Sequence, residues 1–105
     1  MLTGCSNVDT ADIALAERNA VSSVTPMGAP FAATNSALVA KGYDCKMSEG
    51  EFMTESGKTA SAPSFLWCSK RTQPVLGCAI RTQVIVIPQA SVIGQVHFSA
   101  GNVCL

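Results

Sequence analysis

Residues 76–87 read LGCAIRTQVIVI, and this stretch decides the fold class. Its last four residues (84–87) are all β-branched and give the strongest indication of a strand in the chain. A turn is predicted at 88–90, after which 91–99 returns as the next strand. This part of the chain is therefore predicted to form an antiparallel pair of strands.

Weaker patterns predict further strands upstream. Residues 64–71 read as a strand that turns at 72–74, and 43–47 is a short candidate. The intervening segment 48–63 is rich in Gly, Ser, Thr and Glu. We expect a long loop there, although 51–54 could extend a strand.

One amphipathic helix is predicted before the strands, over residues 30–41. Pro30 suits a first helical position, and Gly42 suits a left-handed helix terminator. Three apolar side chains share one face at helical spacing and should lie on the sheet: Phe31, Leu38 and Val39.

The predicted fold is therefore α+β, with one main helix packed on a small antiparallel sheet of about four strands in meander order, stapled by disulfides. Residues 1–25 are expected to be a tether with some helical character, because the apolar stripe there is short and rich in alanine. Residues 26–105 are expected to form a single α+β domain.

The composition fits one folded domain with few charges. Of the 105 residues, 48% are apolar and 13% are charged, against about 25% charged in an average soluble domain. The net charge of zero argues against a dedicated nucleic-acid binder. All seven acidic residues and three of the seven basic residues precede residue 56, so the two halves carry net charges of −4 and +4. Such a polarity could attract an anionic partner.

Leu2-Thr3-Gly4-Cys5 matches every position of a lipobox, and a mostly polar stretch of small residues follows at 6–10. The sequence here resembles that of bacterial lipoproteins, and the resemblance implies acylation of Cys5 and a palmitate-type lipid anchor. A secretory signal needs a basic and an apolar stretch before its cleavage site. We therefore expect a precursor that begins upstream of Met1; the alternative is an accidental match.

The cysteine count agrees with export. With Cys5 acylated, an even number remains, as two disulfides in an oxidising compartment require. The remaining cysteines are Cys45, Cys68, Cys78 and Cys104. Of the three possible connectivities, we favour Cys45–Cys68 with Cys78–Cys104, because each pair would join neighbouring strands.

Alternation along the strands assigns the side chains to two faces. A hairpin turning near Gln73 places Cys68 roughly opposite Cys78, and the face under the helix then carries Leu66, Cys68, Cys78, Ile80, Val84, Val86, Val96 and Phe98. The opposite face carries Phe65, Trp67, Arg81, Gln83, Gln95 and His97. We expect four of these to form an exposed aromatic and cationic binding patch: Phe65, Trp67, Arg81 and His97. Two alternatives stay open: the N-terminal segment covers the patch, or a one-residue slip exchanges the faces.

No arrangement of residues points to catalysis, to a metal or to a cofactor. The single histidine, His97, lies between apolar neighbours and has no acidic residue after Glu55 with which to form a triad. Glu49 and Glu51 lie in the expected loop and are interpreted as solubilising. The cysteines lack the short spacing of structural zinc sites. The sequence therefore predicts a protein that is not an enzyme, with no catalytic residue, cofactor or metal.

We expect a small, non-enzymatic binding or accessory module of the bacterial cell envelope. A lipid anchor would be its one attachment to the membrane, at the periplasmic side of the outer membrane. Its partner would be an unknown envelope protein or polymer, and not nucleic acid. The alternative is a periplasmic inhibitor of a hydrolase, which would insert the 48–63 loop or the hairpin tip near Lys70 into an active site.

Overall fold

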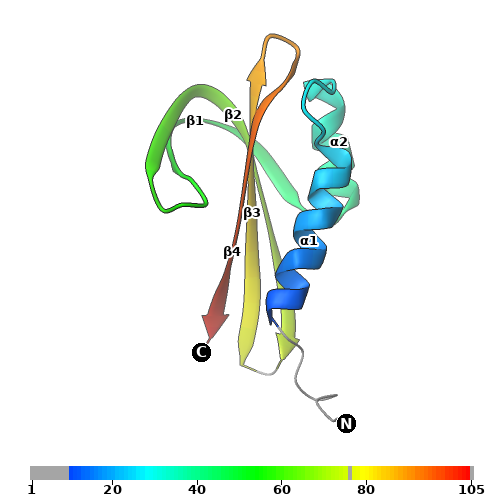
Figure 1. The fold of residues 1–105 in the computed structure, drawn as a ribbon, viewed down its shortest axis with the longest axis vertical. Helices are drawn as coiled ribbons and strands as arrows, with labels where there is room; N and C mark the ends of the chain where they lie inside the picture. Colours follow the sequence, from blue (N-terminus) through cyan, green and yellow to red (C-terminus); the bar gives the residue numbers. More distant parts are fainter. Residues whose placement is uncertain (1–9, 76, 105) are drawn as a thin grey trace.

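In the computed structural model, which describes residues 10–75 and 77–104, two helices cover one face of a four-stranded sheet (Figure 1). The strands lie in the order β1-β2-β3-β4, and each neighbouring pair is antiparallel. The predicted α+β meander is therefore confirmed. The elements are α1 (Thr10–Val24), α2 (Phe31–Ala40), β1 (Asp44–Met53), β2 (Thr59–Val75), β3 (Cys78–Gln89) and β4 (Val92–Cys104).

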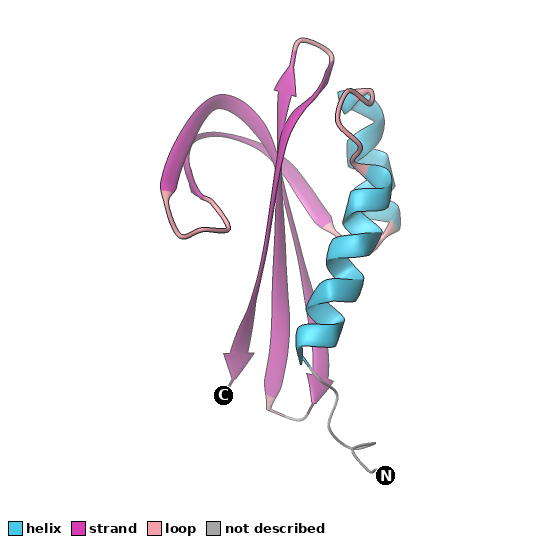
Figure 2. Cartoon of the chain, in the orientation of Figure 1, coloured by secondary structure: helices cyan, strands magenta, loops and turns pink. Residues whose placement is uncertain are grey.

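The expectation of one main helix is wrong, because α1 is a second helix of 15 residues. Both helices lie on the same side of the sheet in Figure 2. Val21 of α1 is 1% exposed and belongs to the main hydrophobic core. An alanine-rich helix that is marginal alone is stabilised here by tertiary packing. The described part of the expected tether, from residue 10 onward, is therefore packed on the sheet.

The second helix begins and ends close to the predicted positions, directly after Pro30 and before Gly42, whose φ is +96°. Leu38 is 0% exposed and Phe31 is half-buried. Val39 was expected to lie on the sheet and does not, because it is 53% exposed. Consecutive helical residues point about 100° apart, so burial of Leu38 turns its neighbour toward solvent.

The segment expected as a long loop is mostly strand. β1 runs to Met53 and β2 begins at Thr59, leaving a tight turn in which the Thr54 N–H donates to the Lys58 carbonyl at 2.8 Å. A register shift between Ser48 and Gly50 bends the hairpin, and bulges commonly produce such bends. In Figure 1 the β1–β2 hairpin curls away from the helices over the other side of the sheet.

The turn between β2 and β3 comes later than predicted. β2 continues to Val75, and Gly77 adopts a φ of +84° in the turn. Cys68 consequently pairs with Val84, six residues beyond the expected Cys78. Side chains alternate with a period of two, so an even displacement changes the register and preserves the faces.

The core between helices and sheet follows from those faces. Nine buried side chains form it: Val21, Leu38, Tyr43, Leu66, Cys68, Val84, Val86, Ile93 and Phe98. Six of these come from the strands, and each fully buried aliphatic or aromatic side chain contributes about 1.5–3 kcal/mol. The buried strand pattern is therefore the main source of stability.

A disulfide joins Cys45 and Cys68, which are register partners on β1 and β2. This half of the predicted connectivity is confirmed. Cys78 is also disulfide-bonded, and its register partner on β4 is Cys104. The side chain of Cys104 lies outside the described part of the structure, so Cys78–Cys104 stays a prediction. Cys5 also lies outside the described residues.

Candidate functional site

The sheet face opposite the helices carries a row of side chains centred on Trp67. Strand pairing aligns Lys46, Trp67, Ile85 and His97 across all four strands. Trp67 is half-buried, and the Lys46 ammonium lies 4.6 Å from the centroid of its ring. An ammonium at that distance is attracted by the negative face of the indole.

The expected patch of four residues is divided, because the curled hairpin covers one end of this face. Phe65 is 2% exposed, with its ring 5.0 Å from that of Phe52. The Phe52 ring also lies 5.4 Å from that of His97. Exposure of Phe65 was therefore wrongly predicted: the cover is supplied by β1, and not by the N-terminal segment. Trp67 and Arg81 remain at the open end.

Two cavities meet at Trp67. The first has a volume of about 240 Å³, and its lining is largely apolar: Ser48, Glu51, Phe52, Met53, Phe65, Trp67, Gln83 and Ile85. The second, of about 200 Å³, is polar and is lined by Asp44, Lys46, Trp67, Ser69 and Arg81. Liquid water occupies about 30 Å³ per molecule, so each cavity accepts a small group and not a large cofactor.

The indole N–H of Trp67 is buried and has no hydrogen-bond partner among residues 10–75 and 77–104. An unsatisfied buried donor costs about 1–3 kcal/mol. Lys46 and Arg81 line the polar cavity together with the carboxylate of Asp44, while Glu51 lines the other cavity. The open end of this face therefore combines apolar side chains, a buried donor without a partner among the described residues, and a polar cavity in which two cations face one carboxylate. We call Lys46, Trp67 and Arg81, with the two cavities, the Trp67 surface.

His97 belongs to a separate contact, in which the hairpin tip is attached to β4. Its Nδ1 lies 3.0 Å from Oε1 of Glu55, and its Nε2 lies 3.2 Å from Oε1 of Gln95. The other Glu55 oxygen accepts the Phe98 N–H at 3.1 Å. The hydrogen bond from His97, with its charge and the backbone N–H groups, holds the pKa of Glu55 below its ordinary value. His97 was predicted in the binding patch and instead fixes the tip.

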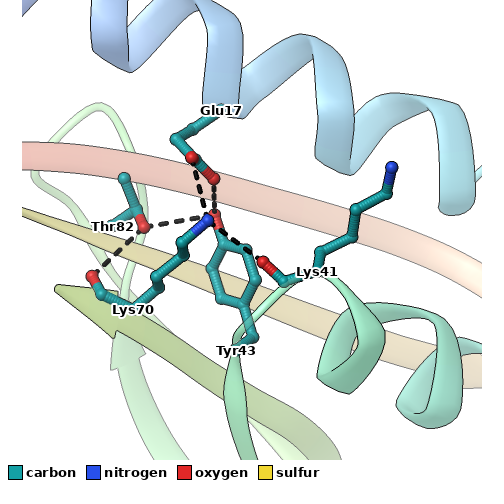
Figure 3. Close-up of polar contacts among 5 residues, drawn as sticks. All are labelled: Glu17, Lys41, Tyr43, Lys70 and Thr82. Atoms are coloured by element: carbon teal, nitrogen blue, oxygen red, sulfur yellow. Dashed lines mark hydrogen bonds and ion pairs between the residues drawn. The ribbon is translucent and has the colours of Figure 1, made fainter. Parts of the chain in front are cut away.

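A second polar cluster joins α1 to the sheet (Figure 3). The Tyr43 hydroxyl donates to Glu17 at 3.1 Å, and Lys70 Nζ contacts the other Glu17 oxygen at 3.0 Å. Lys70 also donates to the Lys41 carbonyl at 3.0 Å. The Thr82 hydroxyl lies 3.1 Å from that of Tyr43. Figure 3 shows all five side chains or carbonyls converging between α1 and the strands.

This cluster has the properties of a structural clasp. Burial, assisted by the nearby Glu17 carboxylate, raises the pKa of Tyr43 to about 12, so its phenol is protonated at neutral pH and is no base. Lys70 was expected at a hairpin tip, but it lies within β2 opposite Thr82, and its charge is paired. The displaced turn explains the error.

Sequence reasoning missed Lys46, Phe52 and Glu55. Lys46 and Asp44 lie two residues apart on β1 and therefore share a face. This pattern was visible in the sequence, but the strand predicted there was very short. Phe52 and Glu55 fall in the segment expected as a loop, and their contacts to β4 span more than forty residues. No local pattern contains such contacts.

Within the described ranges, no three His, Cys, Asp or Glu side chains come together as a metal site would require. Neither described helix is both long and apolar enough to cross a bilayer. Comparison of the chain with protein-family models, curated proteins and solved structures gives no match. The Trp67 surface is therefore the feature of the molecule that bears on its function.

Proposed function

We propose that this protein is a non-enzymatic binding module of the bacterial cell envelope, anchored by lipid at Cys5, which holds its partner on the Trp67 surface. The observation that carries the proposal is the position of Trp67. Its ring lies between an apolar and a cationic cavity, and its N–H lacks an acceptor. Partly buried Trp beside cationic side chains is a composition enriched at interaction hot spots.

The chemistry of this surface favours a partner that presents an apolar group beside an anion. The apolar group would occupy the cavity against Phe52, while the anion would face Lys46 and Arg81. Acidic envelope proteins and anionic envelope polymers both offer such groups.

Two observations support the envelope location. The Leu2–Cys5 pattern resembles a lipobox, and the disulfide between Cys45 and Cys68 is of the kind that persists in oxidising compartments. Intact mass of the protein from its native host tests this part separately. We expect a chain that begins at Cys5 and carries acyl groups; an unmodified chain would contradict the anchor.

The alternative, a hydrolase inhibitor with an inserting loop, has less support. The segment that would insert is a hairpin with a short turn, and Glu55 within this turn is attached to β4. The other candidate, near Lys70, lies in the middle of a strand. Neither segment is therefore an exposed loop anchored by a disulfide, as the inhibitor hypothesis requires.

Photo-cross-linking in the native host tests the Trp67 surface. A photoreactive residue at Asp44, which lines the polar cavity, is compared with one at Val39, which is exposed on α2. We expect a cross-linked product from position 44 alone, lost in Trp67→Ala.

The double variant Lys46→Ala with Arg81→Ala tests the same surface in case Trp67→Ala does not fold. Both cations are exposed, so their replacement should not disturb the fold. It should also abolish the product while leaving the circular dichroism spectrum unchanged. Equal products from positions 44 and 39, or a product that survives in both variants, would contradict the proposal.

A further inference from the structure

Residues 28–31 pair with the start of β4 through backbone hydrogen bonds to Ser91 and Ile93. Beyond Ile93, the outer edge of β4 presents backbone groups that no strand of the described chain pairs. The Phe98 N–H points away from β3, because it donates to Oε2 of Glu55. In a regular antiparallel strand, every second residue directs its N–H and C=O to the same side. Val96 and Ala100 therefore present their backbone groups along the same edge as Phe98.

A groove follows this edge between α1 and the hairpin tip. Two clefts of about 500 and 410 Å³ open along it, and Arg18, Glu55 and Phe98 line both. Residues 95–100 of β4 all line one cleft or the other. Six strand residues extend over about 20 Å, so the groove matches the length of a short added strand.

The charges in the groove favour a carboxylate. Arg18 lies 5.8 Å from the centroid of the Phe98 ring and forms no ion pair with a described residue. One carboxylate already occupies the groove, that of Glu55, which contacts both the Phe98 N–H and the His97 ring. It comes from a largely exposed turn of five residues that lies outside the paired strands β1 and β2.

We propose that the edge of β4 binds an extended, acidic peptide segment of a partner protein as a fifth strand, with Glu55 acting as a removable plug. The peptide backbone would pair with Val96, Phe98 and Ala100, and an acidic side chain would take the place of the Glu55 carboxylate beside His97 and Arg18. Strand addition of this kind obtains affinity from main-chain hydrogen bonds and specificity from side-chain contacts. This groove and the Trp67 surface are separate, so either proposal can fail alone.

The test measures binding of a synthetic peptide, acetyl-Thr-Val-Glu-Val-Thr-Val-amide, by amide NMR spectra of the labelled protein. Glu55→Ala removes the plug, and Glu49→Ala removes the same charge from an exposed position on β1. In the wild type, the groove can bind the peptide only when Glu55 is displaced, and the apparent affinity is reduced by the fraction of molecules in that state. We therefore expect Glu55→Ala to bind the peptide at least about tenfold more tightly than the wild type. Glu49→Ala should equal the wild type.

The peptide should shift the amides of Val96, Phe98 and Ala100, and its Gln-for-Glu analogue should bind more weakly. Glu55→Gln, which retains an acceptor for the Phe98 N–H, gives an intermediate affinity and serves if Glu55→Ala does not fold. Equal affinities of Glu55→Ala and Glu49→Ala, shifts confined to the Trp67 surface, or no binding at millimolar peptide would overturn the proposal. So would dimerisation of Glu55→Ala through these amides, which would make a second copy the occupant.

Discussion

Tyr43 is the one tyrosine of the chain, so its ionisation can be followed without interference. Its phenol is buried beside Glu17, and both burial and the carboxylate disfavour the phenolate. The proton is therefore held more tightly in the folded state than in the unfolded state. The stabilisation is fully present below the ordinary pKa of 10 and is lost as the pH rises through about 12.

We predict a single phenolate transition near pH 12 in an absorbance titration at alkaline pH. Glu17→Gln should lower the pKa of Tyr43, because it removes the neighbouring negative charge, while burial still keeps the value above 10. Circular dichroism at each pH confirms that the fold is retained. A transition at the ordinary value in the folded protein would contradict the buried clasp.

At the scale of single elements, α2 supplies a matched pair of neighbouring residues. Leu38 is fully buried and Val39 is exposed, although the sequence pattern assigned both to one face. We predict that Leu38→Ala lowers the free energy of unfolding by about 2–5 kcal/mol. Val39→Ala should change it by no more than about 0.5 kcal/mol. Urea denaturation measures both, and similar losses for the two variants would show that the helix is rotated.

The hairpin tip depends on the ionised form of Glu55. His97 lowers the pKa of this carboxyl below its ordinary 4.5, so the attachment is present above pH 4.5 and is lost as the pH falls through the lowered pKa. We predict that the chemical shift of the Phe98 amide follows this acid transition. In His97→Ala the transition should move up toward the ordinary value; an unchanged midpoint would mean that His97 does not hold the tip.

The faces of β2, β3 and β4 could be predicted from sequence, because alternation is a local property that survived a six-residue error in register. The hairpin that covers Phe65 could not. Residues 48–63 have the composition of a loop, and they form strands because β1 and β2 pair with each other and Phe52 packs on Phe65. Local composition carries no record of such pairing.

Alternation also predicted which residues of the candidate site share the open face. The hairpin that covers part of this face could not be predicted, and the errors in the site follow from it. Trp67 and Arg81 share the open face, as alternation requires, while Phe65 lies on that face but under cover. The contact of Glu55 with β4 depends on how far the hairpin curls. The extent of that curl is set by the assembled sheet, in addition to the local bulge between Ser48 and Gly50.

For the molecule as a whole, the Cys45–Cys68 disulfide joins the first two strands beneath the helices. It closes a loop with a sequence separation of 23 and includes the fully buried Cys68. We predict that replacing both cysteines with alanine lowers the free energy of unfolding by about 2–4 kcal/mol, chiefly by freeing the unfolded chain. Denaturant titration of the double variant against the oxidised protein measures this. An unchanged midpoint would mean that the bond adds nothing to the native pairing.

The order of the meander also has a consequence for the chain as it emerges, N-terminus first, into the compartment where it folds. Each strand pairs with the one that precedes it in the chain, so the β1–β2 hairpin can form while the remainder is still emerging. The apolar run of β3 then has one partner and one open edge until β4 follows. Strands in that condition are prone to aggregate. The interval between the emergence of β3 and that of β4 is therefore the period in which a chaperone would matter most.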